Sequence, residues 1–147
     1  MEYVSLNNGL KMPMEGIGTF LLSPADAEES VYQALKAGYR LVDTANAYMN
    51  EKGVGRGMKK SGVKREDIFL VTKLWPTEYE DGAKAIDDTL KRLGTDYVDL
   101  LILHQPVGNY LAGYKAMEDA YKAGKVKALG LSNFPQEQIQ DVIDHCE

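Results

Sequence analysis

The sequence predicts an α/β protein built on a parallel β-sheet. Short apolar runs rich in leucine, valine and isoleucine alternate with longer amphipathic segments, which is typical of strand–helix units. Four of the amphipathic segments also end alike, with a basic residue in the last helical turn and a glycine just beyond it. The pairs are Lys36 and Gly38, Lys60 and Gly62, Arg92 and Gly94, and Lys122 and Gly124. These glycines recur roughly every 30 residues, about the length of one βα unit.

Two kinds of strand are expected. A short hairpin opens the chain at residues 5–13, where Asn8-Gly9 is a strong turn signal. The five runs that follow are apolar on both faces, as the strands of a covered parallel sheet are. They span residues 16–20, 39–44, 67–73, 97–104 and 126–133.

Helices are expected between these strands. Ser23 and Pro24 supply an N-cap and a first-turn proline for the first helix. Spacings of three and four residues predict core-facing stripes on two others, at residues 83, 86, 90 and 93 and at residues 110, 114, 117 and 121. A last helix is expected to begin near Pro135 and to be cut short at Glu147.

Five strand–helix units are compatible with two architectures. A doubly wound sheet of the flavodoxin type would fit 147 residues. A (β/α)8 barrel normally needs roughly 250 residues, so this chain would supply only its first part. The periodicity by itself favours the doubly wound sheet, and no linker divides residues 1–147 into separate domains.

The composition is that of an ordinary globular protein and argues against several classes of function. With a net charge of −5, the chain is a poor match for nucleic acid or for an anionic membrane surface. Cys146 is the only cysteine, so no internal disulfide can form, and we expect a cytoplasmic protein without a signal peptide or membrane span. His104, His145 and Cys146 do not have the spacing of metal ligands, so no metal site is expected.

Polar side chains stand at the carboxyl end of each predicted parallel strand. In chain order they are Thr19, Asp43, Lys73, His104, and the pair Ser132 and Asn133. Ligands bind at this edge of parallel α/β folds. Each residue alone also has a structural explanation, such as a helix cap for Asp43, a solvated amine for Lys73 or a core position for His104. Their arrival at one edge favours a functional site.

Asp43, Tyr48, Lys73 and His104 together have the chemistry of an acid–base site. A phenol is a poor proton donor near neutrality unless its phenolate is stabilised. A lysine ammonium can stabilise a phenolate, an aspartate can keep that ammonium charged, and a neutral histidine can orient a substrate oxygen. Such a set suits protonation of a carbonyl oxygen while the carbonyl carbon accepts a hydride.

Longer segments of the chain resemble successive signatures of the aldo-keto reductases. They run almost without interruption from Tyr3 to Glu147 as LNNGLKMPMEGIGTF, GYRLVDTANAYMNEKGVGRGM, VTKLWPTEY, LKRLGTDYVDLLILHQP and GKVKALGLSNF. The resemblance is to bacterial members similar to the 2,5-diketo-D-gluconate reductases. Because the family fold is a (β/α)8 barrel opened by a small hairpin, the resemblance favours the barrel over the doubly wound sheet.

The resemblance implies NADPH-dependent reduction of aldehydes or ketones and assigns roles to the four residues. Tyr48 would be the general acid and Lys73 would stabilise its phenolate. Asp43 would hold Lys73, and His104 would orient the carbonyl. The alternative is a non-catalytic, reductase-like binding or regulatory subunit on the same scaffold.

Further positions follow from the same resemblance. The residues at the nicotinamide end of NADPH would be Thr19, Asp43, Ser132 and Asn133. Phe20 and Trp75 would wall the substrate pocket, which would suit a small sugar-derived or aliphatic carbonyl such as a diketo-gluconate.

The family chain continues for three more strand–helix units. We therefore expect residues 1–147 to form the hairpin and about the first five βα units of a barrel. The further units carry the basic residues that hold the phosphates of NADPH, so this chain is expected to lack part of the cofactor site. Five strands cannot close an eight-stranded barrel, and the open edges would favour self-association.

Overall fold

A parallel sheet of five strands forms the centre of the structure, a computed structural model that describes all 147 residues. The strands are β3 (Gly16–Gly18), β4 (Leu41–Asp43), β5 (Phe69–Leu74), β6 (Leu100–Leu103) and β7 (Leu129–Leu131). They lie in the order β3-β4-β5-β6-β7, so each strand pairs with the next one along the chain. The expected hairpin forms a separate antiparallel pair, β1 (Tyr3–Ser5) and β2 (Lys11–Pro13).

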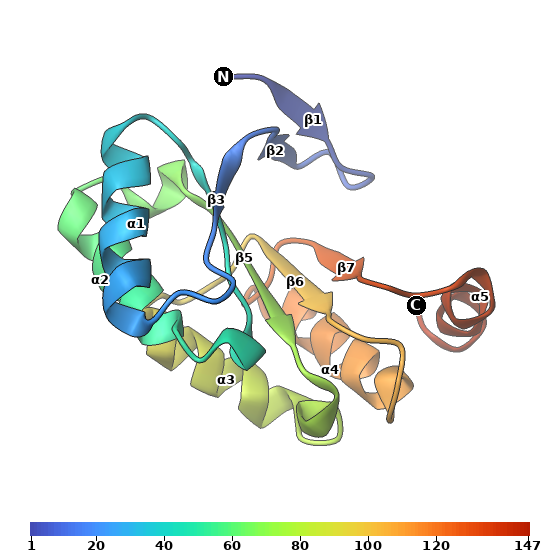
Figure 1. The fold of residues 1–147 in the computed structure, drawn as a ribbon. Coiled ribbons are helices and arrows are strands. Elements are labelled where there is room, and N and C mark those ends of the chain that lie inside the picture. The colour runs from blue at the N-terminus through green and yellow to red at the C-terminus, as the bar shows by residue number, and fades with distance from the viewer.

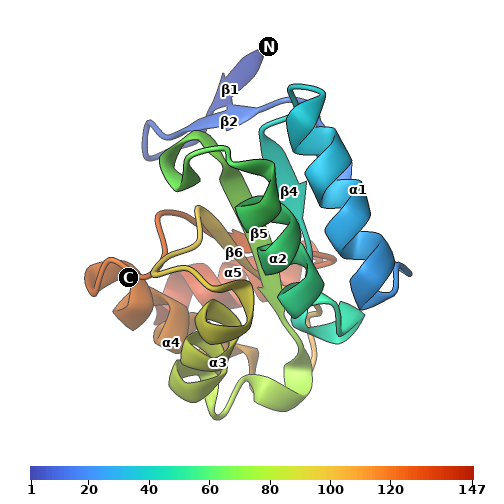
Figure 2. The same ribbon diagram turned by 90° about the vertical axis from the view of Figure 1, so that its left-hand side faces the viewer.

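The helices are α1 (Pro24–Lys36), α2 (Glu51–Ser61), α3 (Gly82–Leu93), α4 (Tyr110–Lys122) and α5 (Gln136–His145). Three short 3-10 turns lie in the connections, η1 (Asn46–Tyr48), η2 (Arg65–Asp67) and η3 (Pro76–Glu78). Helices α1 to α4 pack against one another in chain order on one side of the sheet (Figure 1 and Figure 2). None of the helices combines the length and the apolar character that a membrane crossing requires.

The topology distinguishes between the two expected architectures. A doubly wound sheet reverses its strand order part-way and carries helices on both faces. Here the strand order is continuous and α1 to α4 share one face, as consecutive units of a (β/α)8 barrel do. The doubly wound alternative is therefore wrong. The outer edges of β3 and β7 have no strand partner, as expected for an open arc of a barrel.

The two faces of the sheet differ in burial. Side chains that point to the helices, such as Val42, Leu70 and Leu101, are buried in one apolar core. The intervening residues point to the concave face, where Leu100 and Ile102 of β6 are only half-buried. Only β5 is buried along its whole length. The expectation that all five strands are covered on both faces is thus wrong, because the helices cover one face only.

Most helix ends agree with the sequence signals. The Ser23 hydroxyl accepts a hydrogen bond from the Asp26 backbone N–H at 3.1 Å, which makes Ser23 the N-cap of α1. Gly62 and Gly94 adopt the left-handed conformation directly after α2 and α3. Two stripe positions are wrong. Ala83 is exposed, because the buried face of α3 includes residues 82, 85, 86, 89 and 90. Tyr121, near the end of α4, is 48% exposed.

Glycines let α2 approach both of its neighbouring helices. A Cβ atom at Gly53 would lie 2.1 Å from the Pro24 carbonyl oxygen of α1, and one at Gly55 would lie 2.4 Å from the Leu93 carbonyl oxygen of α3. These contacts are with backbone, which cannot move aside as a side chain can. The glycines in GVGRG therefore set how closely α2 approaches α1 and α3, the helices on either side of it (Figure 2).

We expect Gly53→Ala to destabilise the fold by about 1–3 kcal/mol because the added methyl group collides with α1. The direction of the change in unfolding free energy is informative. In an unhindered helix position, alanine would stabilise the fold by about 1 kcal/mol relative to glycine. Denaturant unfolding measures the difference. Gly18→Ala is the control, because a Cβ atom there meets nothing within 4 Å. A Gly53→Ala variant as stable as the wild type would contradict the close contact between Gly53 and α1.

Candidate active site

The carboxyl ends of β4, β5 and β6 bring three charged or titratable side chains to one face of the sheet. Asp43 of β4 pairs in register with Val71 of β5. Lys73 is two residues after Val71, so Lys73 and Asp43 point to the same face of the sheet. Lys73 in turn pairs with Ile102, one inward-facing position before His104. Because side chains alternate between faces along a strand, all three point to the concave face, opposite the helices.

Lys73 and Asp43 form an ion pair at the centre of this group. The Lys73 ammonium also donates a hydrogen bond to the Thr44 backbone carbonyl at 3.0 Å. The Lys73 side chain is 10% exposed, whereas the Asp43 side chain is 36% exposed. A buried charge is destabilising unless it is paired and hydrogen-bonded, and Asp43 supplies the counter-charge while Thr44 supplies an acceptor. Asp43 does not cap a helix, so that structural explanation for it is wrong.

Tyr48 reaches the same group from the short turn that follows β4. This turn, η1, is followed by Met49, which adopts the left-handed conformation with a φ of 56°. The Lys73 ammonium lies 5.1 Å from the centre of the Tyr48 ring. The Tyr48 hydroxyl makes no hydrogen bond within the protein, so it is free to bond to a ligand.

His104 completes the group as a neutral imidazole. Its ring lies edge-on to Tyr48, with 5.9 Å between ring centroids, and edge-on to Trp75, at 5.1 Å. Burial, followed by the positive charge of Lys73, lowers the pKa of His104 below its usual value. The Nδ1 atom is buried and has no hydrogen-bond partner, which leaves Nε2 as the nitrogen available to a substrate.

The lowered pKa of His104 should make the fold sensitive to acid. As the pH falls below about 6.5, the ordinary histidine value, His104 takes up a proton in the unfolded chain before it does so in the folded chain. The free energy of unfolding should therefore decrease with falling pH in that range, and this decrease should level off below the lowered folded pKa. Urea unfolding at a series of pH values should show a shallower decrease for His104→Gln than for the wild type. Equal slopes would contradict the assignment.

Phe20 and Trp75 flank the four residues. The Phe20 ring lies 5.2 Å from the Tyr48 ring between centroids and is 63% exposed, while Trp75 is 37% exposed. Both aromatic side chains therefore lie beside the four residues, and their role as walls of a substrate pocket stays a prediction. Both side chains keep much of their surface in solvent.

The remaining predicted site residues divide into two groups. Asn133, with a φ of 64°, donates hydrogen bonds from its side-chain amide to the His104 carbonyl and to Ser132 Oγ, each at 3.1 Å. Ser132 and Asn133 thus stand beside His104 at the end of β7. Thr19 is fully buried, and its hydroxyl donates to the Asp43 carbonyl at 3.2 Å. In this arrangement Thr19 supports the loop behind the site and has no surface for a ligand.

A model of the aldo/keto reductase family matches residues 16–147, which is most of the chain. The chain belongs to the aldo/keto reductase family. Glyoxal reductase of Bacillus subtilis (strain 168) is 42% identical over 150 residues, an alignment that covers 99% of this chain and 54% of that protein. The chain spans about half the length of the curated relatives it matches.

Solved structures of other family members share the same arrangement of strands and helices. The aldo/keto reductase from Brucella melitensis superposes with a TM-score of 0.94 at 42% identity, covering 97% of this chain and 58% of that one. The Bombyx mori aldo-keto reductase, solved in complex with NADP, gives a TM-score of 0.92 at 32% identity over 99% of this chain and 54% of that one. The fold is thus the aldo/keto reductase barrel, represented by five of its βα units.

Sequence reasoning missed two buried polar residues of this aldo/keto reductase domain. Asn50 joins the loops after β3 and β4, because its amide donates to the Thr19 and Leu22 carbonyls while its side-chain oxygen accepts from Thr44. Glu51 lies behind Lys73 with a 1% exposed side chain. Both stand at the start of α2, where polar residues usually indicate a solvated first turn. The sequence around Asn50 and Glu51 does not show that these two side chains are buried.

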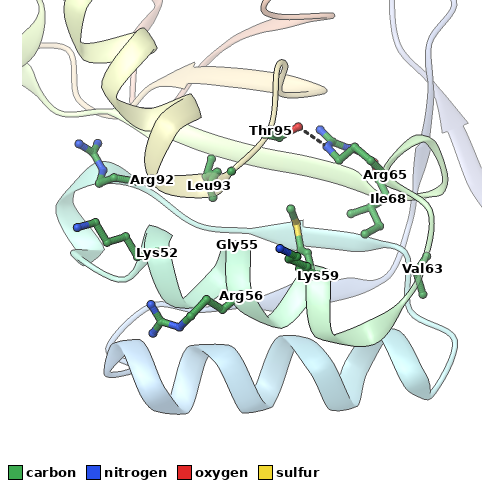
Figure 3. A pocket seen from close by; sticks show the side chains of 12 residues that line it. Lys52, Gly55, Arg56, Lys59, Val63, Arg65, Ile68, Arg92, Leu93 and Thr95 are labelled. Carbon is green, nitrogen blue, oxygen red and sulfur yellow. Dashed lines mark hydrogen bonds between the residues drawn. The ribbon is translucent and has the colours of Figure 1, made fainter.

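A separate hollow of about 390 Å³ lies between α2 and α3, on the helical side of this family domain (Figure 3). Basic side chains surround it, and three of them are held in ion pairs, Arg56 with Glu28, Arg65 with Asp99 and Arg92 with Glu51. None of Asp43, Tyr48, Lys73 and His104 lines it. It is therefore distinct from the candidate active site.

Proposed function

We propose that this protein takes part in the NADPH-dependent reduction of small aldehydes or ketones to alcohols, with Tyr48 as the general acid. One observation carries the proposal. The buried Lys73 ammonium is paired with Asp43 and lies against the Tyr48 ring, whose hydroxyl has no protein partner. That arrangement is suited to hold a phenol ready to give up its proton.

The positions of the side chains support the following proton transfer. A carbonyl oxygen placed between Tyr48 and His104 would accept one hydrogen bond from the phenol and one from the imidazole. As the oxygen gains electron density, the Tyr48 hydroxyl transfers its proton to it. Lys73 stabilises the resulting phenolate by its charge, and Asp43 supplies the counter-charge that holds Lys73 in place. His104, being neutral, orients the carbonyl without adding a charge.

The residues present fit one end of the proposed cofactor. Ser132 and Asn133 place hydroxyl and amide groups beside His104, and such groups can hydrogen-bond a carboxamide like that of nicotinamide. Reduced nicotinamide, when bound, would supply the hydride. Thr19 and Asp43 are also assigned to this end, although Thr19 would have to expose its hydroxyl. The cofactor's phosphates would be held by the further βα units found in the longer relatives.

The proposed substrate is a small carbonyl compound. Phe20 lies beside Tyr48 and Trp75 lies beside His104, so two partly exposed aromatic side chains are available to contact such a substrate. The B. subtilis relative is named a glyoxal reductase, which supports the same class. We further propose a cytoplasmic location, supported by the lone Cys146, and completion of the barrel by added strands along the open edges of β3 and β7.

Activity and cofactor binding test the proposal together. The protein is purified as it occurs, its intact mass is recorded, and oxidation of NADPH is followed with glyoxal. Turnover is expected from a protein that carries a closed barrel. The 147-residue chain of 16.3 kDa alone should bind NADPH weakly in a fluorescence titration, because it holds only the nicotinamide end. Tight binding at that mass would contradict the need for further strands, and binding without turnover would favour the non-catalytic alternative.

A further inference from the structure

Glu51 places a carboxylate in the interior directly behind the candidate active site. It lies in the first turn of α2, three positions after Tyr48, and its side chain is 1% exposed. A buried carboxylate is strongly destabilising unless it is paired and its oxygen atoms accept hydrogen bonds. The surrounding residues should therefore show why the charge is kept there.

The partners of Glu51 come from three separate elements. Its Oε2 atom accepts a hydrogen bond from the Thr72 hydroxyl of β5 at 2.7 Å. Its Oε1 atom accepts one from the Asn46 side-chain amide of η1 at 3.2 Å and forms an ion pair with Arg92 of α3 at 2.8 Å. Thr89 of α3 is a more distant partner at 3.4 Å. Arg92 balances the charge, while the other bonds fix the position of the carboxylate.

Two of these partners belong to the segments that carry Tyr48 and Lys73. Thr72 directly precedes Lys73 in β5, and Asn46 is the first residue of the turn that ends with Tyr48. The turn has no side-chain cap of its own, and its Asn46 amide donates hydrogen bonds both to Glu51 and to the Thr89 hydroxyl. One carboxylate thus connects the segment that carries the phenol to the segment that carries the ammonium.

We infer that Glu51 is a positioning residue that fixes the distance between the Tyr48 ring and the Lys73 ammonium. The inference rests on the proposed function, since the distance matters only if the phenol donates a proton. A small displacement of a catalytic group is costly because proton transfer requires the reacting atoms to be in place before the reaction begins. Loss of the Thr72 bond would remove the hydrogen bond between Glu51 and β5 and leave the ion pair with Arg92 intact.

Thr72→Val and Glu51→Gln test this role. Valine keeps the shape of Thr72 and has a methyl group in place of the hydroxyl. The fold should therefore tolerate Thr72→Val even if it does not tolerate Glu51→Gln. The control is Thr95→Val, which removes a hydroxyl that accepts from Arg65 at 2.9 Å in a separate network. Thr72→Val should lower kcat for glyoxal roughly 10-fold or more. KM should remain within about twofold of wild type, and the control should match wild type in both.

A second measurement does not depend on turnover. Through-space NMR contacts between the Tyr48 ring and the Lys73 side chain report their separation, with Tyr48→Phe used to identify the ring signals. These contacts should weaken in Thr72→Val and persist in Thr95→Val. If both Thr72→Val and Glu51→Gln keep wild-type kcat and contacts while only Tm falls, Glu51 is merely structural and the inference is overturned. If the wild type itself shows no turnover, the proposed function fails, and the NMR contacts still decide the positioning role.

Discussion

Replacing Tyr48 with phenylalanine is expected to lower turnover of a small aldehyde by roughly 10²–10⁴-fold, the usual contribution of a positioned general acid. The change removes one hydroxyl group and keeps the aromatic ring. Contacts of that ring with Phe20, His104 and Lys73 should therefore remain. NADPH binding should change little, because the hydroxyl is free in the structure and supports no neighbouring residue. Steady-state kinetics and a fluorescence titration measure the two quantities separately.

Tyr121→Phe is the matched control for this variant. Tyr121 is 48% exposed on α4, far along the chain from the site, so the loss of its hydroxyl should leave turnover unchanged. Turnover that persists in Tyr48→Phe at the wild-type rate would show that another group donates the proton. A fall in both activity and stability would instead indicate a structural role for the Tyr48 hydroxyl.

Replacing Lys73 with methionine should lower turnover by roughly 10²–10³-fold, comparable to the loss of one preorganised electrostatic partner. Methionine fills much of the same space but cannot stabilise the phenolate of Tyr48. The fold should tolerate the change, because the Asp43 carboxylate that loses its partner is 36% exposed and can be solvated. Steady-state kinetics with glyoxal and NADPH measure this loss.

Lys84→Met provides the comparison for the loss of a lysine charge. Lys84 pairs with Asp88 on the exposed surface of α3, where such pairs contribute little. Its removal should alter neither turnover nor its pH dependence. If Lys73→Met behaves like Lys84→Met, then the buried ion pair serves the fold alone, and the proposed proton donor loses its physical basis.

Much of the fold could be predicted from local patterns. Ser23 at the start of α1 and the glycines after α2 and α3 are signals in which one residue type is required by the backbone geometry. The choice between a doubly wound sheet and a barrel could not be made in this way. It depends on which side of the sheet each helix packs, and the pattern of apolar residues along a helix is the same on either side.

The burial of individual positions was harder to predict. Ala83 fits the three-and-four spacing but lies on the exposed side of α3, since alanine gives a weak signal for either environment. The half-buried residues of β6 read as fully buried because the sequence does not show which faces have a covering layer. These wrong predictions of burial arise because burial depends on the tertiary arrangement. The sequence patterns describe the local conformation well.

For the candidate site, the sequence indicated the residues at the strand ends and missed those behind them. Asp43, Lys73 and His104 could be anticipated because the carboxyl ends of parallel strands converge. Their meeting with Tyr48 is now seen in the structure, and their roles remain proposals. Glu51 gave no signal, since a glutamate in a first helical turn is ordinary on an exposed helix. Its burial follows only from the close packing that Gly53 and Gly55 permit around α2.

The continuous strand order has a consequence for how the molecule is made. Each parallel pair joins strands that are neighbours in the chain, so no strand has to wait for a distant segment before it can add to the sheet. A polypeptide emerging amino end first can therefore extend the sheet in the order of its synthesis. Asp43, Tyr48 and Lys73 come together once β5 has joined β4, and His104 arrives with β6. These four residues would then be ordered on the ribosome, before a nascent chain of the longer relatives has supplied its remaining strands.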